Sequence, residues 1–382
     1  MSPTQAIVCH DPVEGKRQWI LEPISIGEPN EYEAIVEMVA SGICHTDLGC
    51  GTAPDGTPGF PVPKYPRVLG HEGAGYVRAV GKKVTKVVPG DAVLLSFAFC
   101  TRCHNCQYGA PGYCAKFTEL NFVGNAAAFP GSKAEPEKQI GGSFFGQSSF
   151  SQHTRAQETS MVKVTHLVNS REELSMFAPL GCGIQTGAGT ITELAQANPN
   201  DKVVVIGLGG VGLSAIMAAK LRGCRNVIGI DRVPSRLKLA KSLGATHVVN
   251  TTELTDSLVE EIRKITGGSG STVTVDATGV MPLIQQGIEF TANQGKMILL
   301  GVAPMDAGLE VQVVPYMVTG KQLMGSMEGG VYPENYIPQM INWYKNAKFP
   351  VDKLIKFYPV KDYLKAVRDM EDGVTIKPIL LW

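Results

Sequence analysis

The fold is decided by the stretch Lys202-Val-Val-Val-Ile-Gly-Leu-Gly-Gly-Val-Gly212, which joins a short apolar run to a cluster of glycines. The apolar run predicts a buried strand over residues 202–206, and the sequence that follows predicts a helix over residues 210–221. The glycines between them match G-x-G-x-x-G, the pattern of a turn that holds dinucleotide phosphates at a helix N-terminus. A glycine-rich turn in a parallel sheet that binds no cofactor is the alternative interpretation.

Strands and helices alternate along the chain after this stretch. Strands are predicted at 226–230, 246–249, 273–275 and 296–300, and helices at 234–243, 254–266 and 282–290. Such alternation is typical of crossover units, so it predicts an α/β fold with a doubly wound parallel sheet of the Rossmann type. The apolar run 203–219 contains four glycines, and we expect a buried strand and helix there rather than a membrane span.

The glycine-rich turn also carries information about the cofactor. Gly207 permits a tight turn, Gly209 lets the backbone approach a pyrophosphate, and Gly212 lets helix and strand pack closely. Asp231 ends the next predicted strand, where a carboxylate accepts hydrogen bonds from ribose hydroxyls and repels a 2′-phosphate. The sequence therefore predicts NAD rather than NADP.

The N-terminal part of the chain has no long helical pattern. Its short apolar runs are interrupted by glycine and proline, and they predict strands at 34–40, 75–80 and 92–97. We therefore expect a β-rich domain ahead of the parallel sheet.

Four closely spaced cysteines, Cys100, Cys103, Cys106 and Cys114, predict a metal site in this part. Short spacers allow four thiolates to close on one tetrahedral ion, and a full ligand set leaves no position for a substrate. A structural zinc therefore fits best, and a redox-active Cys-x-x-Cys pair is the alternative. His104 lies within the motif but is not needed once four thiolates are present.

Three residues that are far apart in the sequence could form a second metal site. Cys44, His71 and Cys182 are a soft donor set that leaves a fourth position open, as in a catalytic zinc site. Their spacing alone does not establish such a site, because isolated cysteine and histidine side chains are often simply packed in a core.

The composition limits the remaining functions. The chain has 382 residues, enough for roughly two or three domains, and its 35 lysine and arginine residues balance 35 aspartate and glutamate residues. A neutral balance argues against a nucleic-acid partner and against binding to an anionic membrane. The N-terminus carries no export signal, so we expect a cytoplasmic protein whose nine cysteines stay reduced.

Several motifs, in the order in which they occur, resemble those of the zinc-dependent alcohol dehydrogenases of the medium-chain dehydrogenase/reductase superfamily. Gly70-His-Glu-Gly-Ala-Gly75 matches the zinc signature of that family. The chain is similar in particular to the aryl (benzyl) alcohol dehydrogenases, and the resemblance covers nearly all of it. The other matching segments are 42–47, 100–114, 150–153, 181–187, 207–212, 300–303 and 375–379.

The resemblance implies two domains. Residues 1–182 and 327–382 would form a β-rich, GroES-like catalytic domain with a structural-zinc lobe near residues 97–117, and residues 183–326 would form the NAD-binding Rossmann domain. It also implies reversible hydride transfer between a primary alcohol, aromatic or allylic, and NAD to give the aldehyde. We expect two zinc ions per chain and a homodimer or homotetramer.

The resemblance also assigns roles at the catalytic site. Cys44, His71 and Cys182 match the catalytic zinc ligands, and the four-cysteine motif matches the structural zinc site. Thr46 would accept the proton of the alcohol, and Asp47 would orient the imidazole of the zinc ligand. Glu72 matches a carboxylate that helps the zinc to exchange its ligand.

The expected contacts to NAD are His45, Gly207, Gly209, Gly210, Val211, Gly212, Asp231, Arg236, Leu300, Gly301, Val302 and Lys377. By resemblance, His45 and Lys377 would bind the pyrophosphate and Arg236 would lie at the adenosine ribose. Residues 300–302 would run along the nicotinamide.

One position departs from the family pattern. Many members have a histidine five residues after the first zinc cysteine, and it passes the proton from the cofactor ribose to solvent. Gly49 occupies this position here, so the proton path must end in water or another base. Glu328 follows the aryl-alcohol branch, but the sequence assigns it no role.

Three other functions compete with this interpretation. A zinc-free quinone or enone reductase shares the fold, but the complete ligand set argues against it. A glutathione-linked formaldehyde dehydrogenase shares the zinc ligands, but the motifs match the aryl-alcohol branch more closely. A non-catalytic NAD-binding protein would not need intact zinc ligands together with Thr46.

Overall fold

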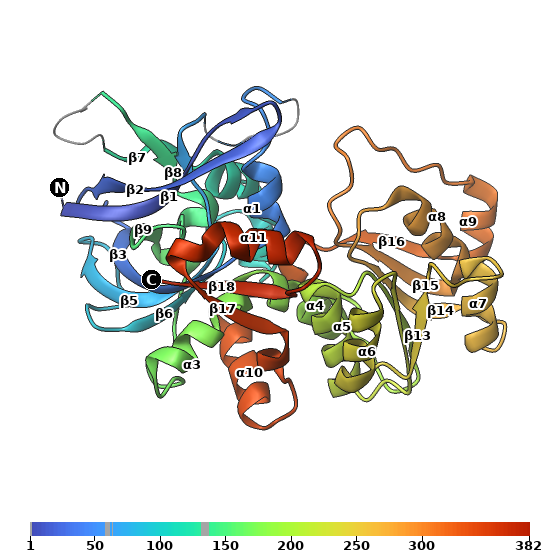
Figure 1. The fold of residues 1–382 in the computed structure, drawn as a ribbon. Coiled ribbons are helices and arrows are strands. Elements are labelled where there is room, and N and C mark those ends of the chain that lie inside the picture. The colour runs from blue at the N-terminus through green and yellow to red at the C-terminus, as the bar shows by residue number, and fades with distance from the viewer. Residues whose placement is uncertain (1, 58–61, 63, 131–136) are drawn as a thin grey trace. The chain divides into compact units, whose positions relative to one another are not determined.

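The computed structural model describes residues 2–57, 62, 64–130 and 137–382. The chain divides into two compact units (Figure 1). The first comprises Met1–Cys182, Tyr332–Asn342 and Asp352–Trp382, and the second comprises Gly183–Val331 and Trp343–Val351. Helix α10 (Pro333–Lys345) therefore contributes residues to both units.

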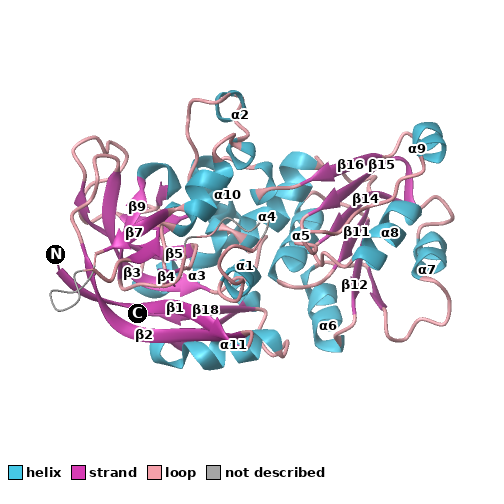
Figure 2. Cartoon of the chain, turned by 90° about the horizontal axis from the view of Figure 1, so that it is seen from above, coloured by secondary structure: helices cyan, strands magenta, loops and turns pink. Residues whose placement is uncertain are grey.

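The second unit contains a six-stranded parallel sheet in the order β13-β12-β11-β14-β15-β16. Its strands are β11 (Lys202–Ile206), β12 (Asn226–Asp231), β13 (His247–Asn250), β14 (Ser271–Asp276), β15 (Thr291–Leu299) and β16 (Gln322–Gly325). Its helices are α4 (Gly183–Gly189), α5 (Gly210–Leu221), α6 (Pro234–Leu243), α7 (Leu258–Ile265), α8 (Met281–Phe290) and α9 (Val313–Thr319). Figure 2 shows α5 and α6 on one face of the sheet and α7 and α8 on the other, so the predicted doubly wound fold is confirmed.

The burial of β11 explains why its sequence is continuously apolar. Val203, Val204, Val205 and Ile206 are all fully buried, because helices cover both faces of the sheet. The apolar run 203–219 is thus β11 followed by α5, as predicted. Within the described ranges, no helix combines the length and the apolar character needed to cross a membrane.

The boundaries of β11, α5 and α6 match the predicted ranges, whereas α7 begins at Leu258 rather than at residue 254. The Ser257 hydroxyl accepts a hydrogen bond from the Glu260 N–H at 3.2 Å, and the Glu260 carboxylate accepts one from the Ser257 N–H at 3.3 Å. This capping box fixes the start of α7. Helices α4 and α9 and strand β16 are not among the predicted elements.

The first unit is built mainly from two sheets, which confirms its predicted β-rich character. One sheet has the order β2-β1-β4-β8-β7, and the other has the order β10-β6-β5-β3-β18-β17, with β9 paired to β3. The strands are β1 (Ser2–Val13), β2 (Lys16–Ile26), β3 (Glu33–Gly42), β4 (Arg67–Val68), β5 (Glu72–Val80), β6 (Ala92–Leu95), β7 (Asn125–Phe129), β8 (Ile140–Gly142), β9 (His153–Gln157), β10 (Met161–Lys163), β17 (Ile355–Pro359) and β18 (Lys377–Leu381). The helices are α1 (His45–Cys50), α2 (His104–Gln107), α3 (Arg171–Met176) and α11 (Tyr363–Glu371).

Strand β18 brings a late segment of the chain to an early one. It pairs antiparallel with β3, with Ile379 opposite Gly42, and the Ile43 N–H donates to the Pro378 carbonyl at 3.0 Å. Residue 377 is thereby placed beside the loop that leads from β3 into α1.

The turn after β11 depends on two glycines. Gly207 has a φ of +89°, in a region that L side chains rarely adopt. A Cβ atom on Gly212 would overlap the carbonyl oxygen of Gly207 and would lie 3.2 Å from a methyl group of Val205. Gly209 differs from both, because a Cβ atom there would meet nothing within 4 Å.

We expect Gly212→Ala to lower the free energy of unfolding by about 2 kcal/mol, since the added methyl group would push α5 away from the turn. Gly209→Ala is the matched control, and it should lower the free energy of unfolding by less than about 1 kcal/mol. Urea unfolding followed by circular dichroism measures both variants. Equal stabilities would contradict this account of the packing.

Candidate functional site

Cys44, His71 and Cys182 come together in the first unit although they are far apart in the sequence. One ligand atom of each residue lies within 4.8 Å of the other two. Cys44 immediately precedes α1, His71 immediately precedes β5, and Cys182 follows a 3₁₀ turn at Ala178–Gly181. His71 and Cys182 are buried, and Cys44 is partly buried. The three residues therefore form one spatial cluster, the catalytic cluster.

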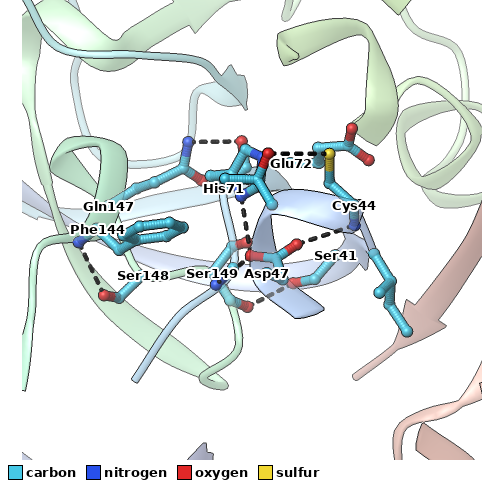
Figure 3. A network of polar contacts seen from close by, with 12 residues as sticks. Ser41, Cys44, Asp47, His71, Glu72, Phe144, Gln147, Ser148 and Ser149 are labelled. Carbon is cyan, nitrogen blue, oxygen red and sulfur yellow. Dashed lines mark hydrogen bonds and ion pairs between the residues drawn. The ribbon is translucent and has the colours of Figure 1, made fainter. Parts of the chain in front are cut away.

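The fully buried carboxylate of Asp47 holds two members of the catalytic cluster, Cys44 and His71, in place (Figure 3). Its Oδ2 accepts a hydrogen bond from the Cys44 N–H at 2.9 Å, at the start of α1. Its Oδ1 accepts bonds from the Gly70 N–H at 3.0 Å and from Nδ1 of His71 at 2.9 Å. Because Nδ1 donates to the carboxylate, Nε2 is the ring atom left to bind a metal.

The catalytic cluster fits a zinc ion. His71 Nε2 is buried and has no hydrogen-bond partner in the described part of the chain, so its lone pair is available to a ligand. A hydrogen bond from Cys182 holds the pKa of the Cys44 thiol well below its ordinary value, although burial opposes this shift. Zinc binds thiolates and neutral imidazole, so two sulfur atoms and one nitrogen suit a zinc site with one open position.

A buried ion pair lies next to the catalytic cluster. Lys377 Nζ is 2.8 Å from Glu72 Oε1, and it donates a second hydrogen bond to the Ile43 carbonyl at 3.1 Å. Burial raises the pKa of the Glu72 carboxyl, and the charge of Lys377 offsets part of that rise. The sequence predicts Lys377 as a pyrophosphate contact, and the structure shows that its ammonium already has a carboxylate partner.

Cys100, Cys103, Cys106 and Cys114 form a second cluster, the four-cysteine cluster, with ligand atoms within 4.8 Å of one another. The Sγ atoms of Cys103 and Cys106 are 3.5 Å apart, and those of Cys100 and Cys106 are 3.9 Å apart. A hydrogen bond from the Ala115 N–H is the main reason why the pKa of the Cys103 thiol is lowered to about 6. All nine cysteines of the chain are free thiols. Four sulfur donors at these distances suit a closed, tetrahedral zinc site.

Three predicted residues near these clusters are exposed or partly buried. His104 is exposed and stacks on Tyr108, with ring centroids 4.2 Å apart, which agrees with the prediction that it is not a ligand. Thr46 is partly buried, and its Oγ1 lies 3.8 Å from the Sγ of Cys44. His45, the predicted pyrophosphate contact, is exposed.

In the second unit, Asp231 connects the turns after β11 and β12. Its Oδ2 accepts a hydrogen bond from the Leu208 N–H at 2.7 Å, and its Oδ1 accepts bonds from the Arg232 N–H at 2.7 Å and the Val233 N–H at 2.9 Å. Arg236 Nη1 lies 3.8 Å from the same carboxylate. The carboxylate thus lies at the carboxyl end of β12, next to the turn that leads into α5. Dinucleotides bind at this position in sheets of this kind.

The other predicted cofactor residues lie near the carboxyl edge of the same sheet. Gly210 and Val211 begin α5. The N–H groups of Leu300 and Gly301 donate to the Asp276 carbonyl at the end of β14, at 2.9 and 3.0 Å. Val302 follows them and is 78% exposed. The contacts of these residues with NAD stay a prediction.

Two further features, one in each unit, are not evident from the sequence. Phe145 stacks on the ring of His71 with centroids 4.5 Å apart, and Phe144 meets the same ring edge-on. Glu328 is buried, has a φ of +53°, and accepts hydrogen bonds from side chains at the start of α4, from Gln185 at 2.9 Å and from Thr186 at 3.5 Å. No local pattern signals either feature, because both depend on contacts between distant segments.

Comparison with known proteins gives matches along most of the chain. A model of the alcohol dehydrogenase GroES-like domain matches residues 30–166, and a model of the zinc-binding dehydrogenase domain matches residues 210–346. The chain is 37% identical to geraniol dehydrogenase of Castellaniella defragrans, over 95% of this chain and 94% of that protein. It is 33% identical to the probable S-(hydroxymethyl)glutathione dehydrogenase 1 of Schizosaccharomyces pombe, over 94% of this chain and 93% of that protein. The crystal structure of benzyl alcohol dehydrogenase from Acinetobacter calcoaceticus has a TM-score of 0.89 and 36% identity, and the match covers 100% of this chain and 99% of that one.

We expect the two clusters to differ in their effect on stability. Cys106→Ala should remove one zinc ion per chain and lower the Tm strongly, because binding of a structural zinc is coupled to folding. Cys182→Ala should also remove one zinc ion per chain, but with a much smaller change in Tm. Metal analysis and thermal unfolding measure these outcomes.

Cys224→Ala is the matched control, because Cys224 is a buried free thiol outside both clusters. This variant should keep about two zinc ions per chain, as should the unmodified protein. A single zinc ion in the unmodified protein would contradict the assignment of two sites.

Proposed function

This chain belongs to the zinc-dependent alcohol dehydrogenases of the medium-chain dehydrogenase/reductase superfamily, and on that premise we propose that it oxidises primary aromatic or allylic alcohols to aldehydes with NAD, reversibly. The observation that carries the proposal is the convergence of Cys44, His71 and Cys182 in the first unit. The substrate class is supported by the names of two relatives, since geraniol is an allylic alcohol and benzyl alcohol an aromatic one.

The residues of the catalytic cluster and their neighbours would have separate roles in the reaction. When bound, zinc would lower the pKa of the alcohol and NAD would accept the hydride. Cys44, His71 and Cys182 would hold the metal, and the hydrogen bond from His71 to Asp47 keeps the ring in one orientation. The hydroxyl of Thr46 would accept the proton of the alcohol.

Glu72 would help the metal to exchange its fourth ligand. Glu72 follows His71 directly in the chain, and its carboxylate is fully buried. The ammonium of Lys377 lies 2.8 Å from this carboxylate and balances its charge. A buried carboxylate is costly without such a partner, so Lys377 supports the ionised form that the exchange requires.

The cofactor would bind to the second unit at the carboxyl edge of its parallel sheet. A 2′-phosphate would approach the carboxylate of Asp231, and this repulsion supports NAD over NADP. The open space at Gly209 supports close approach of a pyrophosphate. Within this proposal, residues 183–326 form the NAD-binding domain, and residues 1–182 with 327–382 form the catalytic domain. His45, Arg236, Lys377 and residues 300–302 complete the proposed contacts.

Aromatic side chains pack against the catalytic cluster, where Phe144 and Phe145 contact the ring of His71. They form a connected set of rings in the first unit, which consists of Phe97, Phe99, Phe117, Phe122, Phe144, Phe145 and Tyr332. Aromatic rings gain from contact with flat, unsaturated groups through offset-stacked and edge-to-face arrangements. Of this set only Phe122 and Tyr332 are partly exposed, and these two would offer such contact to a bound alcohol.

A glutathione-linked formaldehyde dehydrogenase is the second candidate. One relative of 33% identity carries that kind of name, and the match covers 94% of this chain. The identity of 37% to geraniol dehydrogenase favours the free alcohol as substrate.

We also propose that the protein forms homodimers through the parallel sheet of its second unit, as the minimal unit of a dimer or tetramer. Strand β16 is the edge of that sheet, and α9 presents Val313, Val314, Met317 and Val318 with 63–77% of their surface exposed. An exposed apolar helix and an edge strand in the same unit match a second copy of themselves across a two-fold axis. We also propose a cytoplasmic location, which the nine free cysteines support because thiols stay reduced in that compartment.

The proposal is tested by following NAD reduction with benzyl alcohol, an allylic alcohol and ethanol, each with and without glutathione. We expect kcat/KM for the first two alcohols to exceed that for ethanol by about 10-fold or more. One or two additional apolar contacts in the transition state change kcat/KM by about this factor. NAD should be preferred to NADP by about 10-fold or more. Activity with formaldehyde that requires glutathione, without oxidation of benzyl alcohol, would establish the second candidate instead.

The role of Thr46 gives a further prediction. Thr46→Ala should lower kcat by about 10²-fold, the usual effect of losing a positioned proton acceptor, and Thr46→Ser should retain most of the activity. Steady-state rates across the pH range with ordinary and deuterated alcohol measure the effect. Near-normal turnover of Thr46→Ala would show that the proton leaves by another route.

Gly49→His tests the outer part of the same proton path. Gly49 is exposed and a Cβ atom there meets nothing within 4 Å, so the fold accepts the new side chain. We expect a modest rise in turnover below about pH 8, where an added imidazole can carry the proton outward.

A further inference from the structure

The segment 143–148 has an unusual backbone and lies against the catalytic cluster. Ser143, Phe145 and Ser148 have φ angles of +59°, +52° and +68°, which residues other than glycine rarely adopt. Such conformations persist only where the surrounding structure holds them, and they are concentrated at functional sites. The contacts of this segment therefore indicate what the strained backbone achieves.

Hydrogen bonds tie the segment to the residues that lead into His71. The Ser148 hydroxyl accepts a hydrogen bond from the Phe144 N–H at 3.1 Å (Figure 3). It donates one to the Val68 carbonyl at 2.7 Å. Gln147 Nε2 donates to the carbonyl of His71 itself at 3.0 Å. The backbone of His71 and the segment 143–148 are therefore held as one assembly.

Two rings of the same segment contact the imidazole of His71. Phe145 lies nearly parallel to it, with an angle of 23° between the planes and 4.5 Å between the centroids. Phe144 meets it at 83° with centroids 5.4 Å apart. All three side chains are buried, with at most 4% of their surface exposed. With Nδ1 bonded to Asp47, the imidazole is restrained both at its edge and at its face.

The left-handed backbone of Phe145 explains how the stack arises. The direction of a side chain follows from the backbone dihedrals of its residue, so an extended or right-handed residue 145 would project its ring in another direction. The strain at this residue is thus linked to contact with the imidazole rather than to the turn alone.

We propose that Phe145 is a positioning residue for His71, which holds the imidazole so that Nε2 stays directed at the metal and which stabilises the metal-bound ring. A cation on Nε2 withdraws electrons from the imidazole, and the electron-rich face of a phenyl ring attracts such a ring more than a free one. This inference rests on the proposed function, because it concerns a ligand of the proposed catalytic zinc.

The test compares Phe145→Leu with Phe122→Leu. Phe122 is partly buried and contacts the rings of Phe144 and Phe145, but it has no ring contact with His71 among the described residues. Both variants therefore remove the same atoms from one aromatic cluster, and only the first removes the stack. The experiment measures the rate at which the purified holoprotein releases zinc to a colorimetric chelator. Each cluster should give its own kinetic phase, and the phase that is absent in Cys182→Ala belongs to the catalytic cluster.

We expect Phe145→Leu to release zinc from the catalytic cluster about 10-fold faster or more, the effect of losing a residue that orients a metal ligand. Release from the four-cysteine cluster should stay unchanged, and Phe122→Leu should stay within about 2-fold of the unmodified protein in both phases. Substitution of cobalt for zinc gives a second measurement, because the visible absorption of the bound cobalt ion changes when one of its ligands is displaced.

An unchanged catalytic phase in Phe145→Leu would overturn the proposal, and so would an equal acceleration of both phases, since that indicates general destabilisation. If Phe145→Leu does not fold, Phe145→Met, which keeps a long apolar side chain, is judged by the same outcomes. If the unmodified protein shows no phase that depends on Cys182, the proposed zinc site itself fails, which is a different result.

Discussion

The buried carboxylate of Asp47 is the constraint that sets the relative position of Cys44 and His71, two of the three residues of the catalytic cluster. It accepts hydrogen bonds from the Cys44 N–H, the Gly70 N–H and Nδ1 of His71, and it has no contact with solvent. A buried carboxylate without partners is strongly unfavourable, so the folded chain is stable only when these donors surround it. Because Cys44 and His71 lie on separate segments, their relative position is set through this one side chain.

The second unit uses buried carboxylates in a similar way. Asp231 binds N–H groups after β11 and β12, and Asp276 binds the N–H groups of Thr278 and Gly279 after β14. Each carboxylate lies at the carboxyl end of a parallel strand, where the loops leave the sheet. In both units, the loops that carry the functional residues are therefore fixed by backbone hydrogen bonds to a buried acid.

Features that depend on local pattern could be predicted from the sequence, and features that depend on distant contacts could not. Periodicity and glycines were sufficient for β11, α5 and α6, and short spacers were sufficient for the four-cysteine cluster. Cys44, His71 and Cys182 needed the family resemblance, because their spacing contains no geometric information. The stack of Phe145 on His71 requires a left-handed backbone at a residue other than glycine, which no sequence pattern indicates. Periodicity does not predict α9, because its apolar residues face outward and not into a core.

The pairing of β18 with β3 has a consequence for the order of events during synthesis. Lys377 of β18 supplies the cation that balances Glu72, and Ile379 of the same strand pairs with Gly42. Translation delivers these residues some three hundred positions after the thiol and imidazole ligands of the early segment. A nascent chain on the ribosome would have to bury Glu72 without its counter-charge, which is unfavourable. Burial of Glu72 together with its counter-charge therefore requires that β18 has been synthesised and has paired with β3.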